Sequence, residues 1–373
     1  MNGFASAADL LQALIRIPSV NPSGDPGTDS TGEKQCAEFV GAFLDQLGAR
    51  VRFDEVLPGR PNVVAPFPTD RPGKPTLLLA PHTDTVSVKG MTIDPFAGDI
   101  RDGRIWGRGA TDTKGTLAAM LRALQELGPR IATLGHEIWF AGLMGEETGQ
   151  HGSRHLAEQF RPAFVLVGEP TQLDIVHAHK GCTWMTVSTH GRAVHASTPD
   201  LGSNAIYAMA NVIEWIRDGL APALARIPDA TLGSPTVSVG TIHGGSKTNI
   251  VPDHCTIEVD LRTVPAQKRT DLEAILSEGI ASAAPGSEIR FAHATALATD
   301  PAHPLIGLLA AAGGGKPVGA PWFCDAASFG AHGVPAVAAG PGSIAQAHTV
   351  DEWLSVEDLE AGVAFYRRFL ESI

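Results

Sequence analysis

The chain has 373 residues, more than one hydrophobic core usually supports, so its length predicts two domains. Hydrophobic residues make up 43% and charged residues 18%, which is typical of a folded globular protein and not of a disordered one. The formal net charge of −12 argues against binding to nucleic acids or anionic membranes, because both select for an excess of lysine and arginine.

The four cysteines lie far apart and form no CxxC pair. We therefore expect reduced thiols, and neither a disulfide framework nor a thiolate metal site. The N-terminal residues show no basic region followed by an apolar stretch, and no segment has the length and composition of a membrane span. These features predict a cytoplasmic protein.

Apolar residues at helical spacing predict two amphipathic helices near the N-terminus. The first covers residues 10–15, with Ser6 as a candidate N-cap and Pro18 beyond its end, and the second covers residues 40–47. From residue 76 onwards short apolar runs alternate with helical segments, which predicts an α/β fold whose mostly parallel sheet has helices on both faces. Buried strands are predicted at 76–80, 137–143, 164–167 and 335–340, and a helix at 117–124.

The pattern changes around residue 180. Strands are predicted there at 184–190, 236–243, 255–262 and 287–293, and helices at 206–216 and 268–283. The order βαββαβ indicates one inserted ferredoxin-like unit. We therefore expect a discontinuous domain of residues 1–178 and 296–373, interrupted by a second domain of residues 179–295.

Clusters of polar residues directly follow the predicted strands of the first domain. Pro-His-Thr-Asp-Thr follows Ala80, Met-Gly-Glu-Glu-Thr-Gly follows Leu143, Gly-Glu-Pro-Thr follows Val167, and Gly-Pro-Gly-Ser follows Ala339. The carboxyl ends of parallel strands share one edge of a sheet, which is where α/β proteins place their ligand crevice. Residues more than 250 positions apart are therefore expected to converge.

Histidine and carboxylate side chains without cysteine favour zinc or a similar divalent ion in a catalytic site. Three carboxylates, those of Asp112, Glu147 and Glu169, together with one hydroxide would balance the charge of two divalent ions, whereas a single ion would leave excess buried negative charge. Two ions roughly 3.5–4 Å apart can share a water and acidify it. The composition of the clusters thus predicts a dinuclear catalytic site.

Two further carboxylates have positions that indicate other roles. Asp84 lies two residues after His82, so in an extended segment both side chains point the same way and the carboxylate can hold the imidazole N–H. Glu146 directly precedes the proposed ligand Glu147. We interpret Glu146 as the general base that takes a proton from the bridging water and passes it to the leaving amine.

These motifs resemble those of a known enzyme family. His-Thr-Asp-Thr-Val, Gly-Arg-Gly-Ala-Thr-Asp-Thr-Lys-Gly at 107–115, Gly-Glu-Glu-Thr-Gly, Gly-Glu-Pro-Thr and Ala-His-Thr-Val-Asp-Glu at 347–352 occur in the order found in the dinuclear-zinc deacylases and metallopeptidases. This family contains acetylornithine deacetylase, succinyl-diaminopimelate desuccinylase, aminoacylases and glutamate carboxypeptidases. The resemblance covers nearly the whole chain.

The resemblance implies a set of metal ligands. One Zn²⁺ would be held by His82, Asp112 and Glu169 and the other by Asp112, Glu147 and His348, with Co²⁺ or Mn²⁺ as possible substitutes. Asp84 and Glu146 receive the same roles as above. The first domain would then be the catalytic zinc-binding domain of an enzyme that hydrolyses linear amides.

The inserted domain resembles the lid or dimerisation domain of the same family. Gly-Arg-Ala-Val-His-Ala-Ser-Thr-Pro at 191–199 matches the stretch whose histidine, here His195, reaches the active site of the partner subunit and stabilises the oxyanion. Lys-Thr-Asn-Ile-Val-Pro-Asp at 247–253 and Asp-Leu-Arg at 260–262 match substrate-contacting positions, which implies roles for Asn249 and Arg262. A homodimer formed through this domain is expected.

Structural interpretations remain open for several of these residues. A bare Glu146-Glu147 pair would indicate the solvated start of a helix, but its place after a buried strand favours function. Gly340 and Gly342 either form only a turn or offer backbone N–H groups to a substrate. Arg262 either lies at the surface at a strand end or contacts the substrate.

The substrate is predicted only by resemblance. Ala-His-Lys-Gly at 178–181 and Ile-His-Gly-Gly at 242–245 are similar to acetylornithine deacetylases, which implies a small N-acyl amino acid, N-acetylornithine or N-acetylcitrulline first, and a place in arginine biosynthesis. The Asp-Ala at 325–326 departs from that branch, which carries Glu-Ala, and is found in desuccinylases and peptidases. Alternatives are therefore a succinyl-diaminopimelate desuccinylase, a glutamate-carboxypeptidase-like metallopeptidase, or a metal-dependent binding protein without activity.

Overall fold

The computed structural model describes residues 4–373, which form two compact units. The smaller unit consists of Ala178–Ala298 and Gly319–Phe323, and the rest of the described chain forms the larger unit. The sequence-based boundaries were 178–179 and 295–296, and no pattern in the sequence assigned residues 319–323 to the insertion. The functional roles of the two units stay predictions.

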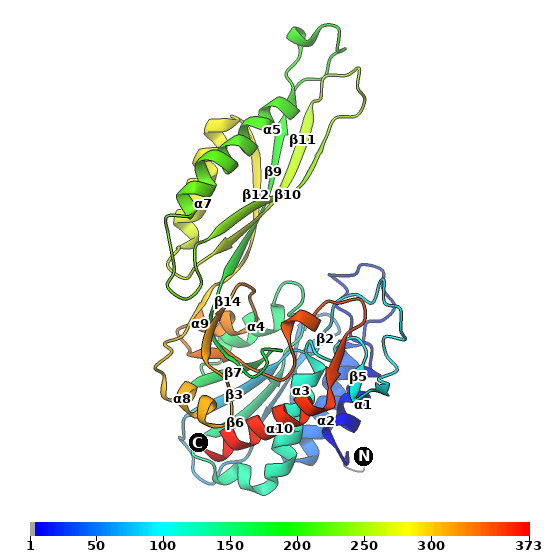
Figure 1. Cartoon of the computed structure of the whole chain (residues 1–373), viewed down its shortest axis with the longest axis vertical. Coiled ribbons are helices and arrows are strands. Elements are labelled where there is room, and N and C mark those ends of the chain that lie inside the picture. The colour runs from blue at the N-terminus through cyan, green and yellow to red at the C-terminus, as the bar shows by residue number, and fades with distance from the viewer. Residues whose placement is uncertain (1–3) are drawn as a thin grey trace. The chain divides into compact units, whose positions relative to one another are not determined.

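The largest sheet has the strand order β1-β2-β6-β3-β7-β15-β8-β13, with β14 paired to β8 (Figure 1). Its strands are β1 (Arg52–Leu57), β2 (Arg60–Pro66), β3 (Thr76–Pro81), β6 (Glu137–Gly142), β7 (Phe164–Gly168), β8 (Ile175–His179), β13 (Leu297–Ala298), β14 (Pro317–Ala320) and β15 (Ala336–Ala338). The central strands β6, β3, β7 and β15 run parallel, whereas β1 and β2 at one end, and β8 and β13 at the other, are antiparallel. The mostly parallel central sheet confirms the predicted α/β fold.

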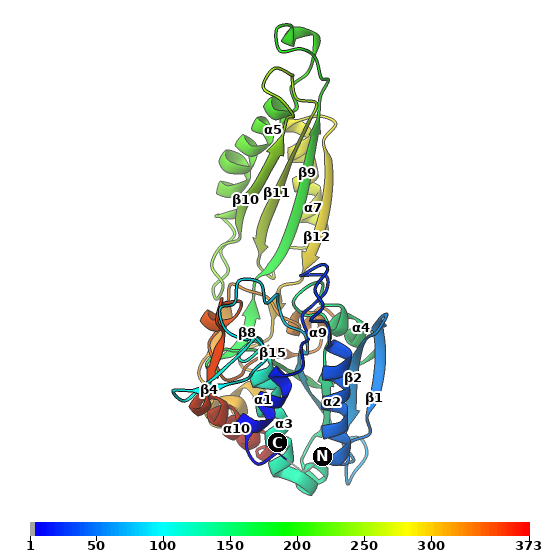
Figure 2. The ribbon, with the colours of Figure 1, turned by 90° about the vertical axis from the view of Figure 1, so that its right-hand side faces the viewer.

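Helices cover both faces of this sheet (Figure 2). They are α1 (Ala7–Ile15), α2 (Glu33–Gln46), α3 (Lys114–Leu127), α4 (His151–Gln159), α8 (Pro304–Ala311), α9 (Ala326–Gly330) and α10 (Val356–Glu371). α1, α3 and α10 pack on one another and share the main core with Leu77 and Leu79 of β3. Leu78 is equally buried outside that core, because successive side chains of a strand point to opposite faces. α4 and α9 contact each other, and α9 also contacts β7 and β15.

Local signals account for some of these elements and not for others. Ser6 caps α1 as predicted, since its Oγ accepts from Asp9 N and Asp9 Oδ2 accepts from Ser6 N. The β1–β2 hairpin was not predicted, because β1 carries Arg52, Asp54 and Glu55 and has no apolar run. The larger unit also contains the short helix η1 (Gly128–Thr133) and a small sheet of β16 (Trp353–Ser355), β5 (Arg104–Trp106) and β4 (Ile100–Arg101).

The smaller unit is an antiparallel sheet with the order β10-β11-β9-β12 and helices on one face (Figure 1). Its elements are β9 (Gly181–His190), η2 (Pro199–Leu201), α5 (Ala205–Glu214), the π-helical turn η3 (Trp215–Leu220), α6 (Ala221–Leu224), β10 (Thr236–Gly244), β11 (His254–Thr263), α7 (Arg269–Ala283) and β12 (Glu288–Ala294). Met209 of α5 and Leu276 of α7 pack with Val187 and Ile257 of the sheet in one core. The βαββαβ order confirms the ferredoxin-like prediction.

Among residues 4–373, no helix combines the length and the apolarity that crossing a membrane requires.

Candidate metal centre

Five predicted ligands come together where parallel strands of the larger unit end. His82 directly follows β3, Glu169 directly follows β7, and Glu147 lies in the loop after β6. Asp112 lies just before α3, and His348 lies beyond β15 and the short helix η4 (Ile344–Gln346). The carboxyl ends of β3, β6, β7 and β15 share one edge of the sheet because these strands are parallel.

The five side chains form two groups that share Asp112. One group consists of His82, Asp112 and Glu169 and the other of Asp112, Glu147 and His348, with the ligand atoms of each group within 4.8 Å of one another. Asp112 Oδ1 lies 3.1 Å from His82 Nε2, and Asp112 Oδ2 lies 3.3 Å from His348 Nε2. Each oxygen of this carboxylate thus faces a different histidine. This is the arrangement that a carboxylate bridging two cations requires.

The buried charge of these groups fits divalent cations. Glu147 Oε1 and Glu169 Oε1 are buried and have no hydrogen-bond partner among the described residues. Burial, with the negative charge of Asp112 beside it, raises the pKa of Glu147 to about 7 and the pKa of Glu169 well above its ordinary value. Buried carboxylate oxygens that lack a partner need a counter-charge, and the histidine and carboxylate donors match zinc or a similar ion.

The two histidines differ in their surroundings. His82 is buried, and its Nδ1 lies 3.0 Å from the carbonyl oxygen of Asp84. A proton on Nδ1 leaves Nε2 free to bind a cation. His348 is more exposed, adopts a positive φ of 60°, and lies 2.9 Å from Glu147 through Nε2. Hydrogen bonds to Asp112 and Glu147 raise the pKa of His348 to about 10.

Asp84 has a wider role than its spacing from His82 indicated. Its carboxylate lies 3.4 Å from His82 Nδ1, in line with the predicted support of the imidazole. The same carboxylate accepts hydrogen bonds from the backbone N–H groups of Glu146 and Glu147, at 3.0 and 3.1 Å, and from Asn21 Nδ2 at 2.8 Å. Burial opposes ionisation of Asp84, but the partners around it, with His82 first, lower its pKa. Asp84 therefore supports two ligand-bearing segments at once.

Glu146 belongs to neither ligand group, although it is adjacent to the ligand Glu147. Burial, and then the negative charge of Glu169, raise the pKa of Glu146 well above its ordinary value. A carboxyl group with a raised pKa holds a proton more readily than an ordinary carboxylate, which a group that accepts and returns a proton needs. The role of Glu146 as general base stays a prediction.

Glu352 is a buried residue of the site that the sequence analysis missed. Its carboxylate accepts from the backbone N–H groups of Gly109, Thr111 and Asp112 at 2.7–3.0 Å and from Arg108 Nη1 at 2.9 Å. Glu352 thereby joins the segment that follows His348 to the loop that carries Asp112. The only signal in the sequence was the motif at 347–352, in which Glu352 follows the proposed ligand His348 by four residues. This spacing did not reveal which groups Glu352 contacts.

Asp325 is a second carboxylate whose surroundings only the structure shows. It is fully buried, Oδ1 accepts from Ser153 Oγ, and Oδ2 has no hydrogen-bond partner among residues 4–373. Burial raises the pKa of Asp325 to about 7 against the hydrogen bond from Ser153. Its charge raises the pKa values of Glu146 and Glu169, so Asp325 belongs to the same electrostatic cluster.

Gly340 and Gly342 have structural reasons to be glycine. The N–H of Gly340 donates to Thr171 Oγ1 at 3.1 Å, so the expected donation to a substrate is not supported for this group. A Cβ on Gly340 would lie 2.6 Å from the carbonyl oxygen of Glu169. Gly342 has a φ of +81°, which L side chains rarely adopt. The turn interpretation therefore accounts for both positions.

The smaller unit places His195 and Asn249 on adjacent loops. His195 pairs with Ile250 in an isolated bridge, and Ala196 N donates to the carbonyl oxygen of Asn249 at 3.0 Å. The imidazole is exposed, and its Nδ1 lies 2.7 Å from Ser197 Oγ. If Ser197 donates a hydrogen bond to Nδ1, the ring proton of neutral His195 lies on Nε2. The Nε2–H group can then donate to an oxyanion.

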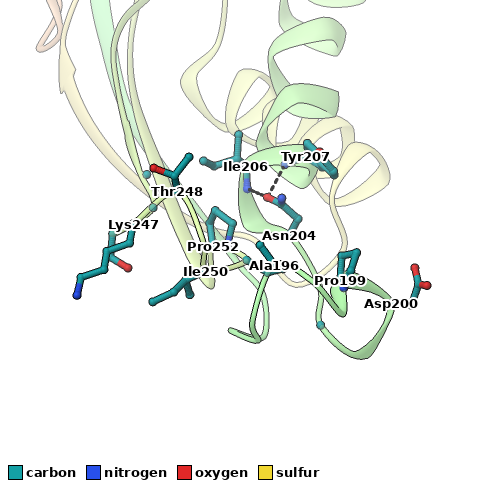
Figure 3. Close-up of a pocket in the computed structure, with 15 residues that line it drawn as sticks. Ala196, Pro199, Asp200, Asn204, Ile206, Tyr207, Lys247, Thr248, Ile250 and Pro252 are labelled. Atoms are coloured by element: carbon teal, nitrogen blue, oxygen red, sulfur yellow. Dashed lines mark hydrogen bonds between the residues drawn. The ribbon is translucent and has the colours of Figure 1, made fainter.

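These loops border a pocket of about 920 Å³ within the smaller unit, shown in Figure 3. Its lining combines polar and apolar residues, and Asn204 caps α5 beside it by accepting from Ile206 N at 2.9 Å and Tyr207 N at 3.3 Å. The lining residues labelled in the figure are Ala196, Pro199, Asp200, Asn204, Ile206, Tyr207, Lys247, Thr248, Ile250 and Pro252.

Arg262 lies on β11 of the same unit and already has an anionic partner. Its Nε and Nη2 donate to the two carboxylate oxygens of Asp260 at 2.8 and 3.0 Å. Trp184 Nε1 also donates to Asp260, at 3.1 Å, and the guanidinium lies 5.8 Å from the ring centroid of Phe323. The edge of Arg262 formed by Nε and Nη2 is therefore taken, and a substrate carboxylate would have to bind through Nη1 or displace Asp260.

The chain matches a known protein family and named relatives. Residues 78–372 match peptidase family M20/M25/M40. The chain is 32% identical to an acetylornithine deacetylase of Klebsiella pneumoniae over 371 residues, which covers 95% of this chain and 94% of the relative. It is also 32% identical to an acetylornithine deacetylase of Pectobacterium atrosepticum, with coverage of 93% and 92%.

Solved structures share the whole fold. An M20 family metallo-carboxypeptidase of Sulfolobus solfataricus aligns with a TM-score of 0.81 at 19% identity, covering 99% of both chains. The aminopeptidase PepT of Bacillus cereus aligns with a TM-score of 0.77 at 23% identity, covering 98% of this chain and 97% of the other. The family match over most of the chain, together with the predicted motifs, confirms the resemblance: the protein belongs to peptidase family M20/M25/M40 and is a metal-dependent amide hydrolase.

Proposed function

We propose that the protein removes the acyl group from a small N-acyl amino acid, N-acetylornithine or N-acetylcitrulline in the first place, with two zinc ions at the centre. The observation that carries this proposal is Asp112, whose two oxygens face His82 and His348 and so belong to both ligand groups. The named activity of the relatives at 32% identity supports the deacetylase assignment. A role in arginine biosynthesis and a cytoplasmic location belong to the same proposal.

Each residue of the centre has a defined task in this reaction. The ions, when bound by the two ligand groups, would polarise the amide carbonyl and acidify a water between them. Glu146, which neighbours the ligand Glu147 in the chain and belongs to neither ligand group, would accept a proton from the attacking water and donate it to the leaving amine. Asp84 and Glu352 hold the backbone of the segments that carry Glu146 and Asp112.

Two other substrates are kept as alternatives because of Asp325. A desuccinylase acting on N-succinyl-diaminopimelate, or a glutamate-carboxypeptidase-like peptidase, would carry aspartate at this position. Asp325 is fully buried beside Ser153, and a glutamate would have to fit one more methylene into that space. Nothing in the packing around Asp325 favours the acetylated over the succinylated substrate.

A panel of N-acyl amino acids tests the substrate assignment. Purified protein loaded with Zn²⁺ is expected to hydrolyse N-acetylornithine or N-acetylcitrulline with a kcat/KM at least tenfold above that for N-succinyl-diaminopimelate and for glutamyl peptides, a preference worth about 1.4 kcal/mol. Turnover of the succinylated substrate alone would replace the deacetylase by the desuccinylase. Zinc binding without turnover of any amide would favour the non-catalytic binding protein.

We also propose that the smaller unit forms a homodimer. Tyr207 is 72% exposed, Leu201 62% and Ile242 52%, although these are large apolar side chains. Tyr207 lines the pocket of Figure 3, and Ile242 lies on β10, which pairs only with β11 among the described strands. An exposed edge strand with apolar neighbours is a surface that soluble proteins usually cover. A second copy of the chain covers it in this proposal.

Mixed dimers test whether His195 acts across that interface. His195→Ala and Glu146→Gln chains, each nearly inactive alone, are coexpressed with different tags and purified as the doubly tagged species. Because a two-fold dimer pairs the intact Glu146 of one chain with the intact His195 of the other, about half of the native activity should return. If His195 serves its own chain, the mixed species has no complete site and stays inactive. A monomeric mass with full activity would equally refute the role across the interface.

A further inference from the structure

The loop that follows β6 is held by side-chain oxygens at four consecutive backbone N–H groups. Met144 N donates to Asn62 Oδ1 at 3.0 Å, and Gly145 N donates to Glu33 Oε1 at 3.1 Å. The next two N–H groups, of Glu146 and Glu147, donate to Asp84 as described above. Backbone N–H groups usually pair with backbone carbonyl groups of a helix or a sheet. Here side chains of other segments accept from all four, so these side chains hold the loop in position.

Asn62 holds both ends of the loop. Its Oδ1 accepts from Met144 N before Glu146 and Glu147, and its Nδ2 donates to the carbonyl oxygen of Gly152 after them, at 2.9 Å. Asn62 is fully buried on β2. The backbone also joins these two residues, since Gly152 N donates to the carbonyl oxygen of Met144 at 3.0 Å. The Asn62 amide therefore reinforces the link between the end of β6 and the first turn of α4 from a third segment, β2.

Glu33 is fixed in turn by an ion pair. It begins α2 and is 3% exposed, and it accepts hydrogen bonds from Arg60 Nε and from Arg60 Nη2, the latter at 3.1 Å. A buried carboxylate costs free energy unless it is paired, and Arg60 supplies the pairing. Gly145, whose N–H reaches Glu33, has a φ of +73°, so the backbone turns there in the left-handed region.

We propose that Glu33, Arg60 and Asn62, the loop clamp, are positioning residues that aim Glu146 and Glu147 at the metal centre. This inference rests on the proposed function and deepens it, because it assigns to the first 62 residues a part in the reaction. All three residues lie outside the range 78–372 that the family match covers. Base and ligand sit on neighbouring residues, so a shift of the loop displaces both together.

The consequences of releasing the clamp are specific. A displaced Glu146 lowers kcat, since misplacement by about 1 Å can cost about a hundredfold in rate. A displaced Glu147 weakens the ion held by Asp112, Glu147 and His348. The ion held by His82, Asp112 and Glu169 keeps all its ligands, because none of them lies on this loop.

Asn62→Ala tests the clamp in the full-length, zinc-loaded protein. Its kcat is expected to fall about ten- to hundredfold with KM within about twofold, and a Zn²⁺ titration by calorimetry should show one of the two binding steps weakened. Thr299→Val is the matched control. Thr299 is also buried and makes one accepted and one donated hydrogen bond to the backbone, both to Ala336, so its loss lowers stability without touching the loop.

Asn62→Ser decides the question if Asn62→Ala does not fold. Its uncharged hydroxyl can pair with Met144 N or with the carbonyl oxygen of Gly152 but not with both, so a smaller fall in kcat with unchanged KM is expected. Native kcat in a folded Asn62 variant, an equal loss in Thr299→Val, or equal weakening of both zinc steps would overturn the clamp. If the native protein itself neither binds zinc nor hydrolyses amides, the proposed function fails instead.

Discussion

Replacing Glu146 by glutamine is expected to lower kcat by roughly two to four orders of magnitude, which is the usual contribution of a general base. The amide keeps the shape of the side chain but cannot take a proton. Because Glu146 belongs to neither ligand group, both metal ions should stay bound in this variant. The measurement pairs steady-state kinetics on the best substrate of the panel with elemental analysis of the same sample.

The control for this variant is Glu158→Gln. Glu158 is an exposed residue of α4, the helix that follows the same loop, so the substitution removes one carboxylate without reaching the centre. Its kcat should stay within about twofold of the native value, as for most surface substitutions. Unchanged turnover in Glu146→Gln would remove the base assignment. Loss of metal from it would show that Glu146 is a ligand after all.

Removal of metal is expected to abolish turnover and to lower the melting temperature, both reversibly. Chelation leaves Glu147 Oε1 and Glu169 Oε1 buried without any partner, and stability supplied by binding is lost with the ligand. An ion present at a thousand times its Kd contributes about 4 kcal/mol. Activity, melting temperature and bound metal are followed while Zn²⁺, Co²⁺ or Mn²⁺ is added back. Two equivalents per chain should restore the rate.

Ligand variants separate the two ions. Asp112→Asn should weaken both, because each oxygen of Asp112 faces a different group, whereas Glu169→Gln and His348→Ala should each weaken one. Asp45→Asn, at an exposed position of α2, is the charge-matched control and should bind two ions normally. A chelator-resistant rate, with no metal found in active protein, would end the metal mechanism. Weakening of a single step in Asp112→Asn would mean that the carboxylate does not bridge.

The sequence predicted the α/β fold, the ferredoxin-like insertion and the sheet edge where polar residues meet, because each depends on a local pattern. Strands such as β3 and β7 are continuous apolar runs, and a candidate metal ligand directly follows each of them. The antiparallel hairpin of β1 and β2 gave no such signal, since the charged residues Arg52, Asp54 and Glu55 interrupt the apolar residues of β1. Asn62 and Arg60 of β2 became members of the proposed loop clamp only through their contacts in the structure.

By itself, the sequence determined the candidate ligands, their order along the chain and the family, because these depend on residue types placed at strand ends. Tertiary structure alone decided that Asp112 divides its oxygens between His82 and His348, that Glu352 accepts three backbone N–H groups of the loop before α3, and that Arg262 is paired with Asp260. The physical reason is that a buried polar side chain finds its partners across the fold, on segments brought near by packing of the core. Hydrophobic periodicity records which face of an element is buried, but it carries no information about which distant N–H group a carboxylate will meet.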